Sequence, residues 1–110
     1  MGQVVAINTA NFEQEVLKAE GLVLVDFYAP WCSHSRRASP VMESLANTYE
    51  GRVKVGKLDV FADNSLSVKY RIFSTPTVII FKKGEEVARI AGSAVREGVQ
   101  PKLDALLAAS

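Results

Sequence analysis

Residues 22–35 read LVLVDFYAPWCSHS, and this stretch decides how the chain folds. Residues 22–28 are apolar on both faces of a strand, with a single carboxylate, Asp26, among them. Continuous rather than alternating hydrophobicity is typical of a strand that is covered on both sides, as in a parallel sheet flanked by helices. Cys32, the only cysteine in the chain, comes where this strand gives way to a helix. The stretch therefore predicts an α/β fold in which a buried strand leads to a thiol at a helix N-terminus.

The residues before this stretch predict a strand and a helix. Residues 4–7, VVAI, read as a short strand. Asn11 is placed to cap the helix that follows, and Gln14, at the third position, is placed to reach back as in a capping box. Gly21 ends this segment.

The residues after Cys32 predict a longer helix. Its apolar face is made of Ala38, Val41, Met42, Leu45, Ala46 and Tyr49. Pro40 lies inside this periodicity, and we expect it to kink the helix because proline removes a backbone hydrogen bond.

The second half of the chain predicts three strands and two helices. Residues 52–60 read as a strand and residues 64–70 as a short helix. Residues 77–81 and 86–90 read as two strands, and the Lys83-Gly84-Glu85 segment between them indicates a hairpin.

Gly92 precedes a final amphipathic helix, whose first turns contain Pro101. The resulting order is β-α-β-α-β-α-β-β-α. It predicts an α/β fold with a central mixed β-sheet flanked by helices. At 110 residues, we expect a single domain that spans residues 1–110.

The composition argues against several classes of partner. The formal net charge of +1 lacks the basic excess that a nucleic-acid surface requires. Residues 1–8 do not resemble a signal peptide, and no stretch approaches the roughly 18 apolar residues of a membrane span. A single cysteine forms no internal disulfide, so the fold needs no oxidising compartment. We therefore expect a cytoplasmic protein that binds neither nucleic acid nor membranes.

Cys32 is the candidate nucleophile. At a helix N-terminus, a thiol faces unpaired backbone N–H groups and the positive end of the helix dipole, which favour the thiolate. Cysteines in such positions have pKa values of roughly 3.5–7.5 instead of about 8.5. A buried, inert cysteine is the alternative, but the helix start and the basic residues that follow favour a reactive thiol.

Ser35 stands where a C-x-x-C redox pair would have its second sulfur. A hydroxyl can hydrogen-bond to the Cys32 thiolate, but it forms no stable bond to sulfur and cannot resolve a mixed disulfide. We therefore expect the chemistry to stop after Cys32 has attacked a substrate disulfide.

Further residues accompany this motif along the chain. They are Asp26, Trp31, Pro40, Lys57, the Thr75-Pro76-Thr77 segment and Gly84. Together with the motif, they make the chain similar to the thioredoxin family over essentially its whole length. It departs from the family pattern at Ser33-His34, where Gly-Pro is usual, and at Ser35, which replaces the second cysteine. Thr75 and Tyr28 replace a common Ile and a common Trp.

The resemblance implies a thioredoxin fold and a protein thiol–disulfide oxidoreductase. It implies disulfide-containing protein substrates, no metal and no organic cofactor. If Ser35 replaces a cysteine of a parent protein, the reductant of that two-cysteine parent would be a flavin-containing thioredoxin reductase.

The resemblance also assigns roles around Cys32. Asp26 assists proton transfer when the mixed disulfide is resolved, with Lys57 on the neighbouring strand as its partner. Burial should raise the pKa of Asp26, whereas Lys57 should lower it. The Thr75–Pro76 bond should be cis, in a loop that pairs with an extended substrate. The substrate-binding residues would be Trp31, Ser33, Ile72, Phe73, Thr75, Pro76 and Gly92. Among them, Trp31, Ile72, Phe73 and Gly92 would form an apolar rim beside this loop.

His34 lies in the first helical turn, beside the sulfur. A protonated imidazole would stabilise the thiolate, which makes the corresponding disulfide more oxidising. Disulfide-forming oxidases of this fold carry His at this position, so we expect a two-cysteine parent to be less reducing than an ordinary thioredoxin. The alternative is a solvated histidine with no electronic role.

Two origins of Ser35 fit the sequence. One is a deliberate Cys→Ser substitution in an atypical C-S-H-C thioredoxin, which the near-isosteric serine favours, and the other is a natural monothiol member of the family. Two other functions remain as alternatives: a monothiol module that binds an iron–sulfur cluster through Cys32, and a non-redox partner subunit or chaperone that uses the apolar rim alone. We expect a monomer, with a Cys32–Cys32 dimer on oxidation.

Overall fold

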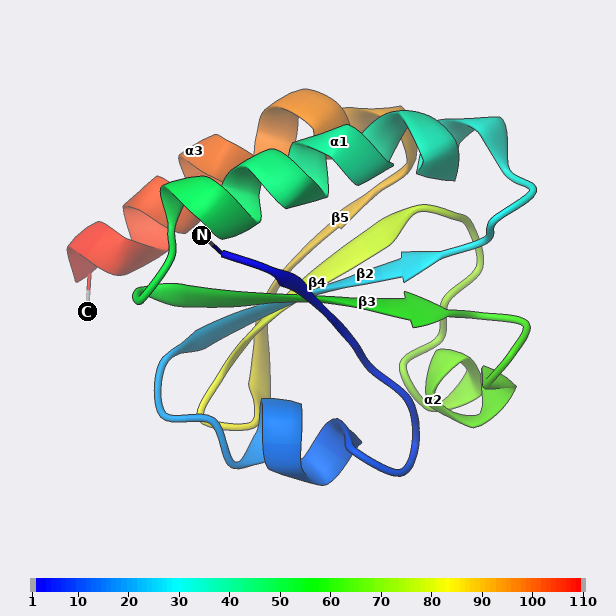
Figure 1. The fold of residues 1–110 in the computed structure, drawn as a ribbon, viewed down its shortest axis with the longest axis horizontal. Coiled ribbons are helices and arrows are strands. Elements are labelled where there is room, and N and C mark those ends of the chain that lie inside the picture. Colours follow the sequence, from blue (N-terminus) through cyan, green and yellow to red (C-terminus); the bar gives the residue numbers. More distant parts are fainter. Residues whose placement is uncertain (1, 110) are drawn as a thin grey trace.

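A mixed β-sheet forms the centre of the computed structural model, which describes residues 2–109 (Figure 1). Its strands are β1 (Val4–Ala6), β2 (Leu22–Tyr28), β3 (Val53–Asp59), β4 (Thr77–Lys82) and β5 (Glu85–Ala91). Within the described residues, they form one five-stranded sheet in the order β1-β3-β2-β4-β5. β2 runs parallel to β3 and antiparallel to β4, so the expectation of a mixed sheet is confirmed.

Helices cover both faces of this sheet (Figure 1). α1 (Ser33–Thr48) and α3 (Val95–Ala109) lie on one face, and α2 (Asn64–Lys69) and the π-helix η1 (Glu13–Leu17) lie on the other. A 3-10 helix, η2 (Gly92–Ala94), leads into α3. The predicted order of strands and helices is therefore confirmed. Among residues 2–109, no helix has the length and apolar character needed to cross a membrane.

β2 is buried on both faces, as its continuous hydrophobicity predicts. Leu22 and Leu24 pack in the apolar cluster beneath α1 and α3, whereas Val25 and Phe27 pack in the cluster on the opposite face. Full burial of side chains such as Leu24 and Phe27 contributes about 1.5–3 kcal/mol each. Because side chains alternate along a strand, Asp26 shares the face of Leu24 and lies under α1.

The predicted capping box at Asn11 and Gln14 is wrong. η1 begins at Glu13, and no side chain caps its N-terminus. The Asn11 Oδ1 atom instead accepts a hydrogen bond of 2.8 Å from the Asn8 N–H, and Asn11 Nδ2 donates to the Ala6 carbonyl at 2.9 Å. Asparagine side chains readily bond to nearby backbone groups, so Asn11 closes the turn after β1 instead of capping the helix.

The predicted hairpin joins β4 to β5 through Lys83 and Gly84. Both residues have positive φ angles, 52° and 82°, as a type I′ turn requires. Glu85, expected in the turn, is already the first residue of β5.

Candidate active site at the start of α1

Cys32 occupies the N-cap position of α1, beyond the end of β2. Its thiol is half-buried, and Sγ donates a hydrogen bond of 3.4 Å to the backbone carbonyl oxygen of Thr75. The Cys32 carbonyl accepts the Arg36 N–H at 3.0 Å, the first hydrogen bond of the helix. The strand-to-helix transition therefore presents the sulfur at the positive end of α1.

The pKa of the Cys32 thiol is lowered from its ordinary value. The largest cause is a hydrogen bond from the Thr75 side chain, followed by one from the Ser35 backbone N–H. Partial desolvation opposes this shift, and the His34 backbone N–H and the Ser35 hydroxyl add smaller contributions that lower the pKa. These hydrogen bonds favour the thiolate, the form of cysteine that attacks disulfides.

Ser35 lies in the first turn of α1 and is only 2% exposed. Its Oγ atom accepts a hydrogen bond of 3.2 Å from the Ala29 N–H. The hydroxyl is therefore held between the end of β2 and the thiol, at the position expected for a second sulfur.

Asp26 is buried beneath α1, with 3% of its surface exposed. Its register partner across the sheet is Lys57 on β3. Burial raises the pKa of Asp26 to about 7, although the positive charge of Lys57 lowers it in part. Both directions agree with the sequence-based expectation, and burial has the larger effect.

The Thr75–Pro76 peptide bond is cis, as the resemblance implies. The Pro76 carbonyl accepts a hydrogen bond of 2.8 Å from the Gly92 N–H, and the Thr77 hydroxyl donates to Ser74 at 2.7 Å. Gly92 has a positive φ of 66°, which suits glycine. These contacts bring Gly92 next to the loop that contacts Cys32.

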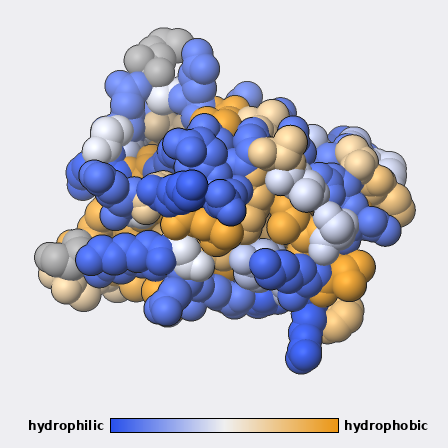
Figure 2. All heavy atoms as spheres, turned by 90° about the horizontal axis from the view of Figure 1, so that it is seen from below, coloured by the Kyte–Doolittle hydropathy of each residue, from blue (hydrophilic) through white to orange (hydrophobic). Residues whose placement is uncertain are grey.

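An aromatic hollow of about 210 Å³ lies on one side of this loop. It is lined by Trp31, Val60, Phe61, Ile72, Phe73, Ser74 and Thr75. The Trp31 and Phe61 rings lie 5.2 Å apart, and Phe73 is 91% exposed. In Figure 2, apolar surface is visible at the right-hand end of the molecule, the end at which β2 and β3 finish in Figure 1.

Sequence reasoning placed Trp31, Ile72 and Phe73 at this rim but missed Phe61. Phe61 follows the end of β3 and is 66% exposed. An aromatic residue just after a strand that ends beside the thiol was the available signal, but periodicity does not distinguish it from a core residue.

A cationic hollow, also about 210 Å³, includes the first turn of α1. It is lined by His34, Arg37, Gly92, Ser93, Arg96 and Glu97. Ser33 and His34 are both exposed at the helix start. Sequence reasoning singled out His34 and Gly92, and it used the basic residues after Cys32 only as support for a reactive thiol. It did not bring Arg37 and Arg96 together, because they come from different helices.

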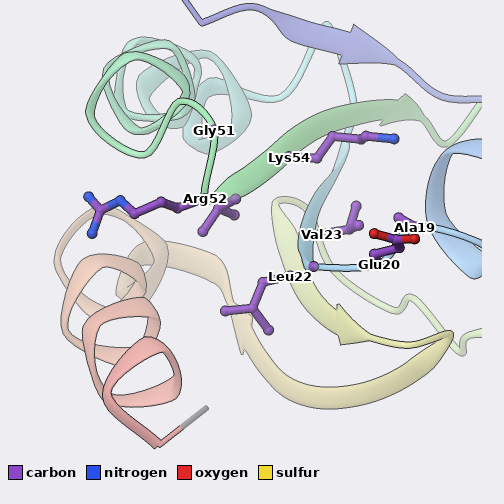
Figure 3. Close-up of a pocket in the computed structure, with 9 residues that line it drawn as sticks. Ala19, Glu20, Leu22, Val23, Gly51, Arg52 and Lys54 are labelled. Carbon is purple, nitrogen blue, oxygen red and sulfur yellow. The ribbon is translucent and has the colours of Figure 1, made fainter.

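A third hollow, of about 370 Å³, lies at the opposite end of the sheet, where β2 and β3 begin (Figure 3). Arg52 and Lys54 point in different directions there, and the Lys54 ammonium pairs with the Glu15 carboxylate at 3.2 Å. The nine lining residues include no thiol, hydroxyl or imidazole. This hollow therefore offers no nucleophile comparable to Cys32. Within residues 2–109, no cluster of three or more His, Cys, Asp or Glu side chains is arranged to hold a metal ion.

Comparisons with known proteins agree with the fold. The family model described as Thioredoxin matches residues 3–105. Thioredoxin C-2 of Corynebacterium nephridii is 43% identical over 100 residues, which cover 89% of this chain and 93% of that protein. Thioredoxin of Staphylococcus aureus is 39% identical over 101 residues, which cover 92% of this chain and 95% of that protein. This chain therefore belongs to the thioredoxin family, whose members are thiol–disulfide oxidoreductases.

Proposed function

We propose that this chain attacks protein disulfides through Cys32 and stops at the mixed disulfide because residue 35 is a serine. The observation that carries this proposal is the pairing of a half-buried thiol at the N-cap of α1 with a buried hydroxyl one turn later. The first group suits nucleophilic attack, whereas the second has no chemistry that completes the cycle.

The first step is a thiol–disulfide exchange. The Cys32 thiolate attacks one sulfur of the substrate disulfide, and the substrate S–S bond breaks as the new S–S bond forms. The other substrate sulfur leaves as a thiolate and takes a proton from solvent. One disulfide replaces another, so this step needs no external oxidant or reductant.

The second step requires a thiol that Ser35 does not supply. In a two-cysteine parent, a thiolate at position 35 attacks the Cys32 sulfur and releases the reduced substrate. The Asp26 carboxyl group, with its pKa of about 7, is suited to accept the proton of that second thiol, and Lys57 helps to set its pKa. With Ser35 in place, Asp26 has no thiol proton to accept.

The surface around Cys32 supports protein substrates. We assign the contact with an extended substrate segment to the Thr75–Pro76 loop and to Gly92, by strand addition. Trp31, Ile72 and Phe73 supply an apolar contact on one side, and Ser33 lies exposed at the helix start. The reductant of a two-cysteine parent is a thioredoxin reductase, and we place the protein in the cytoplasm because its fold needs no disulfide.

We further infer that Ser35 takes the place of a resolving cysteine. Serine and cysteine are close in size, and the Ser35 side chain is buried, where its Oγ atom accepts a hydrogen bond from the Ala29 N–H. This local fit supports a substitution in an otherwise complete site.

The test measures how many covalent adducts and how many substrate thiols form per chain. Reduced protein, freed of small thiols, is mixed with an excess of a model protein disulfide, and both covalent adduct and released substrate thiol are counted. We expect one adduct and one released thiol per chain. The Ser35→Cys variant should instead leave no adduct and release two thiols as it forms its own disulfide.

Cys32→Ala is the control that separates redox chemistry from simple binding. It should form no adduct, whereas a chaperone or partner subunit that uses the apolar rim alone would still bind the substrate. An unaltered chain that forms no adduct, or a Ser35→Cys variant that stays covalently attached, would show that the proposal is wrong.

A further inference from the structure

Cys32 lies between two hollows of unlike chemistry. The aromatic hollow includes Thr75, whose carbonyl oxygen accepts the Cys32 hydrogen bond. The cationic hollow includes His34, whose backbone N–H contributes to the lowered pKa of Cys32. It also includes Gly92, which is hydrogen-bonded to Pro76 on the same loop. A polypeptide attached to the Cys32 sulfur is therefore within reach of both hollows.

The cationic hollow carries unpaired positive charge. Arg37 and Arg96 are exposed, and the side chain of neither forms an ion pair or a hydrogen bond with another residue among 2–109. Glu97 is the only carboxylate among the lining residues. Two arginines against one glutamate leave the hollow positive whatever the charge on His34.

Three other cations of the chain are engaged by neighbouring groups. Arg89 is paired with Glu86 at 2.8 Å, and Lys54 is paired with Glu15 at 3.2 Å. Arg36, the exposed neighbour of Arg37, donates to the Pro30 carbonyl at 3.3 Å. Arg37 and Arg96 thus retain free guanidinium groups in the hollow that includes His34 and Gly92. A guanidinium binds a carboxylate through two parallel hydrogen bonds.

We propose that the cationic hollow selects protein disulfides that carry an Asp or Glu side chain next to the reacting cysteine. The proposal rests on the proposed capture of disulfides by Cys32 and adds the class of substrate. Arg37 and Arg96 hold the substrate carboxylate while Cys32 attacks, so they are specificity-determining residues. The aromatic hollow contacts the other side of the same polypeptide.

The size of the effect follows from the exposure of both arginines. Exposed ion pairs are weak, so the two arginines together should favour an acidic substrate by about two- to fivefold. Salt should reduce this preference, because the charges are open to solvent.

The test uses three synthetic peptides that differ only beside a single cysteine, which is flanked on both sides by Glu, by Gln or by Lys. The cysteine is activated as a 2-pyridyl disulfide, so attack by Cys32 forms the peptide adduct and releases 2-thiopyridone, whose absorbance gives the rate. Each rate is divided by that of 2,2′-dipyridyl disulfide, an uncharged reagent. This division removes any change in the intrinsic reactivity of Cys32.

We expect the Glu peptide to react about two- to fivefold faster than the Gln peptide at low ionic strength, and the Lys peptide to be slowest. High salt should abolish this difference in rate among the three peptides, and so should the Arg37→Gln and Arg96→Gln changes. Lys82→Gln is the matched control, because it removes one positive charge at the far end of β4, opposite Leu22. It should leave the order intact.

Equal corrected rates for the three peptides would overturn this inference while leaving disulfide capture in place. The same conclusion follows if Lys82→Gln weakens the preference as much as the arginine changes do. If none of the disulfides reacts with Cys32, the proposed function itself is wrong. The two failures are therefore distinguishable.

Discussion

Asp26 and Lys57 face each other in register on β2 and β3, yet the Lys57 ammonium lies over the Tyr28 ring, 5.9 Å from its centroid. The Asp26 Oδ1 atom is buried and has no hydrogen-bond partner within residues 2–109. Burial therefore outweighs the attraction of Lys57, and the pKa of Asp26 is raised to about 7. Between this value and the unfolded-state pKa of about 3.9, the folded chain binds a proton that the unfolded chain has lost.

This difference predicts that the free energy of unfolding falls as the pH rises from about 4 to about 7 and then levels off. A group that binds more protons in the folded state stabilises the fold at low pH and loses that contribution as pH passes its folded-state pKa. From pH 5 to pH 8, the loss should be about 2–3 kcal/mol. Urea unfolding at both pH values measures it.

Asp26→Asn is the control for this titration, because the amide has no proton to lose in this range. The variant should show a smaller fall in stability over the same interval, and the difference between the two chains isolates Asp26 from other titrating groups. Parallel pH dependence in both chains would contradict the raised pKa.

The hydroxyl of Thr75 should control the acidity of Cys32. Its hydrogen bond is the largest cause of the lowered pKa. Thr75→Val removes this hydroxyl and should therefore raise the pKa of Cys32, whereas Thr75→Ser retains it. The ultraviolet absorbance of the thiolate, followed against pH, measures both. A Thr75→Val curve that overlays that of the unaltered chain would assign the acidity to the helix start alone.

His34 should make a two-cysteine version of this site more oxidising. In the Ser35→Cys background, His34→Pro should lower the reduction potential, because a protonated imidazole at this position would stabilise the thiolate of the reduced form. Equilibration with glutathione redox buffers measures the potential. His34→Gln separates loss of the imidazole from the backbone effect of proline. If all three proteins have the same potential, His34 is a solvated residue without an electronic role.

The aromatic hollow should accelerate capture of protein disulfides but not of small ones. Phe61→Ser and Phe73→Ser remove exposed apolar side chains near Cys32. Each should slow adduct formation with a protein disulfide by about fivefold, the loss typical of an interface residue that contributes about 1 kcal/mol. The rate with 2,2′-dipyridyl disulfide should not change.

Val87→Ser is the matched control for the aromatic hollow. Val87 is also an exposed apolar residue, 41% accessible, but it lies on β5 and lines neither hollow beside Cys32. It should leave both rates unaltered. An equal slowing by all three changes would indicate a general loss of surface hydrophobicity.

The fold was predictable where a sequence pattern is compatible with only one local structure. The uninterrupted apolar run of residues 22–28 requires cover on both faces, and β2 is covered on both faces. Lys83 and Gly84 likewise made a tight hairpin the natural reading. The predicted cap at Asn11 was wrong because an asparagine side chain can cap a helix or close a turn. Residue spacing does not show which backbone groups lie within reach of that side chain.

The site was predictable in its chemistry but less so in its surroundings. The position of Cys32 at a helix start followed from local sequence, and the resemblance supplied Asp26 and the loop at Pro76. Arg37 and Arg96 lie 59 residues apart in the chain, and they line one hollow only because α1 and α3 share a face of the sheet. The proximity of these two arginines depends on tertiary packing, which a local sequence pattern does not predict.

The serine at position 35 also affects how long the proposed adduct lasts. With no internal group able to displace a captured protein, the lifetime of the proposed adduct depends on how often a thiol from the surroundings reaches the Cys32 sulfur. Scarce thiols would leave partners attached, and abundant thiols would free them. The fraction of chains in adducts would then depend on the recent concentration of thiols in the surroundings. A chain with its own second thiol would lose this dependence, because it resolves each adduct itself.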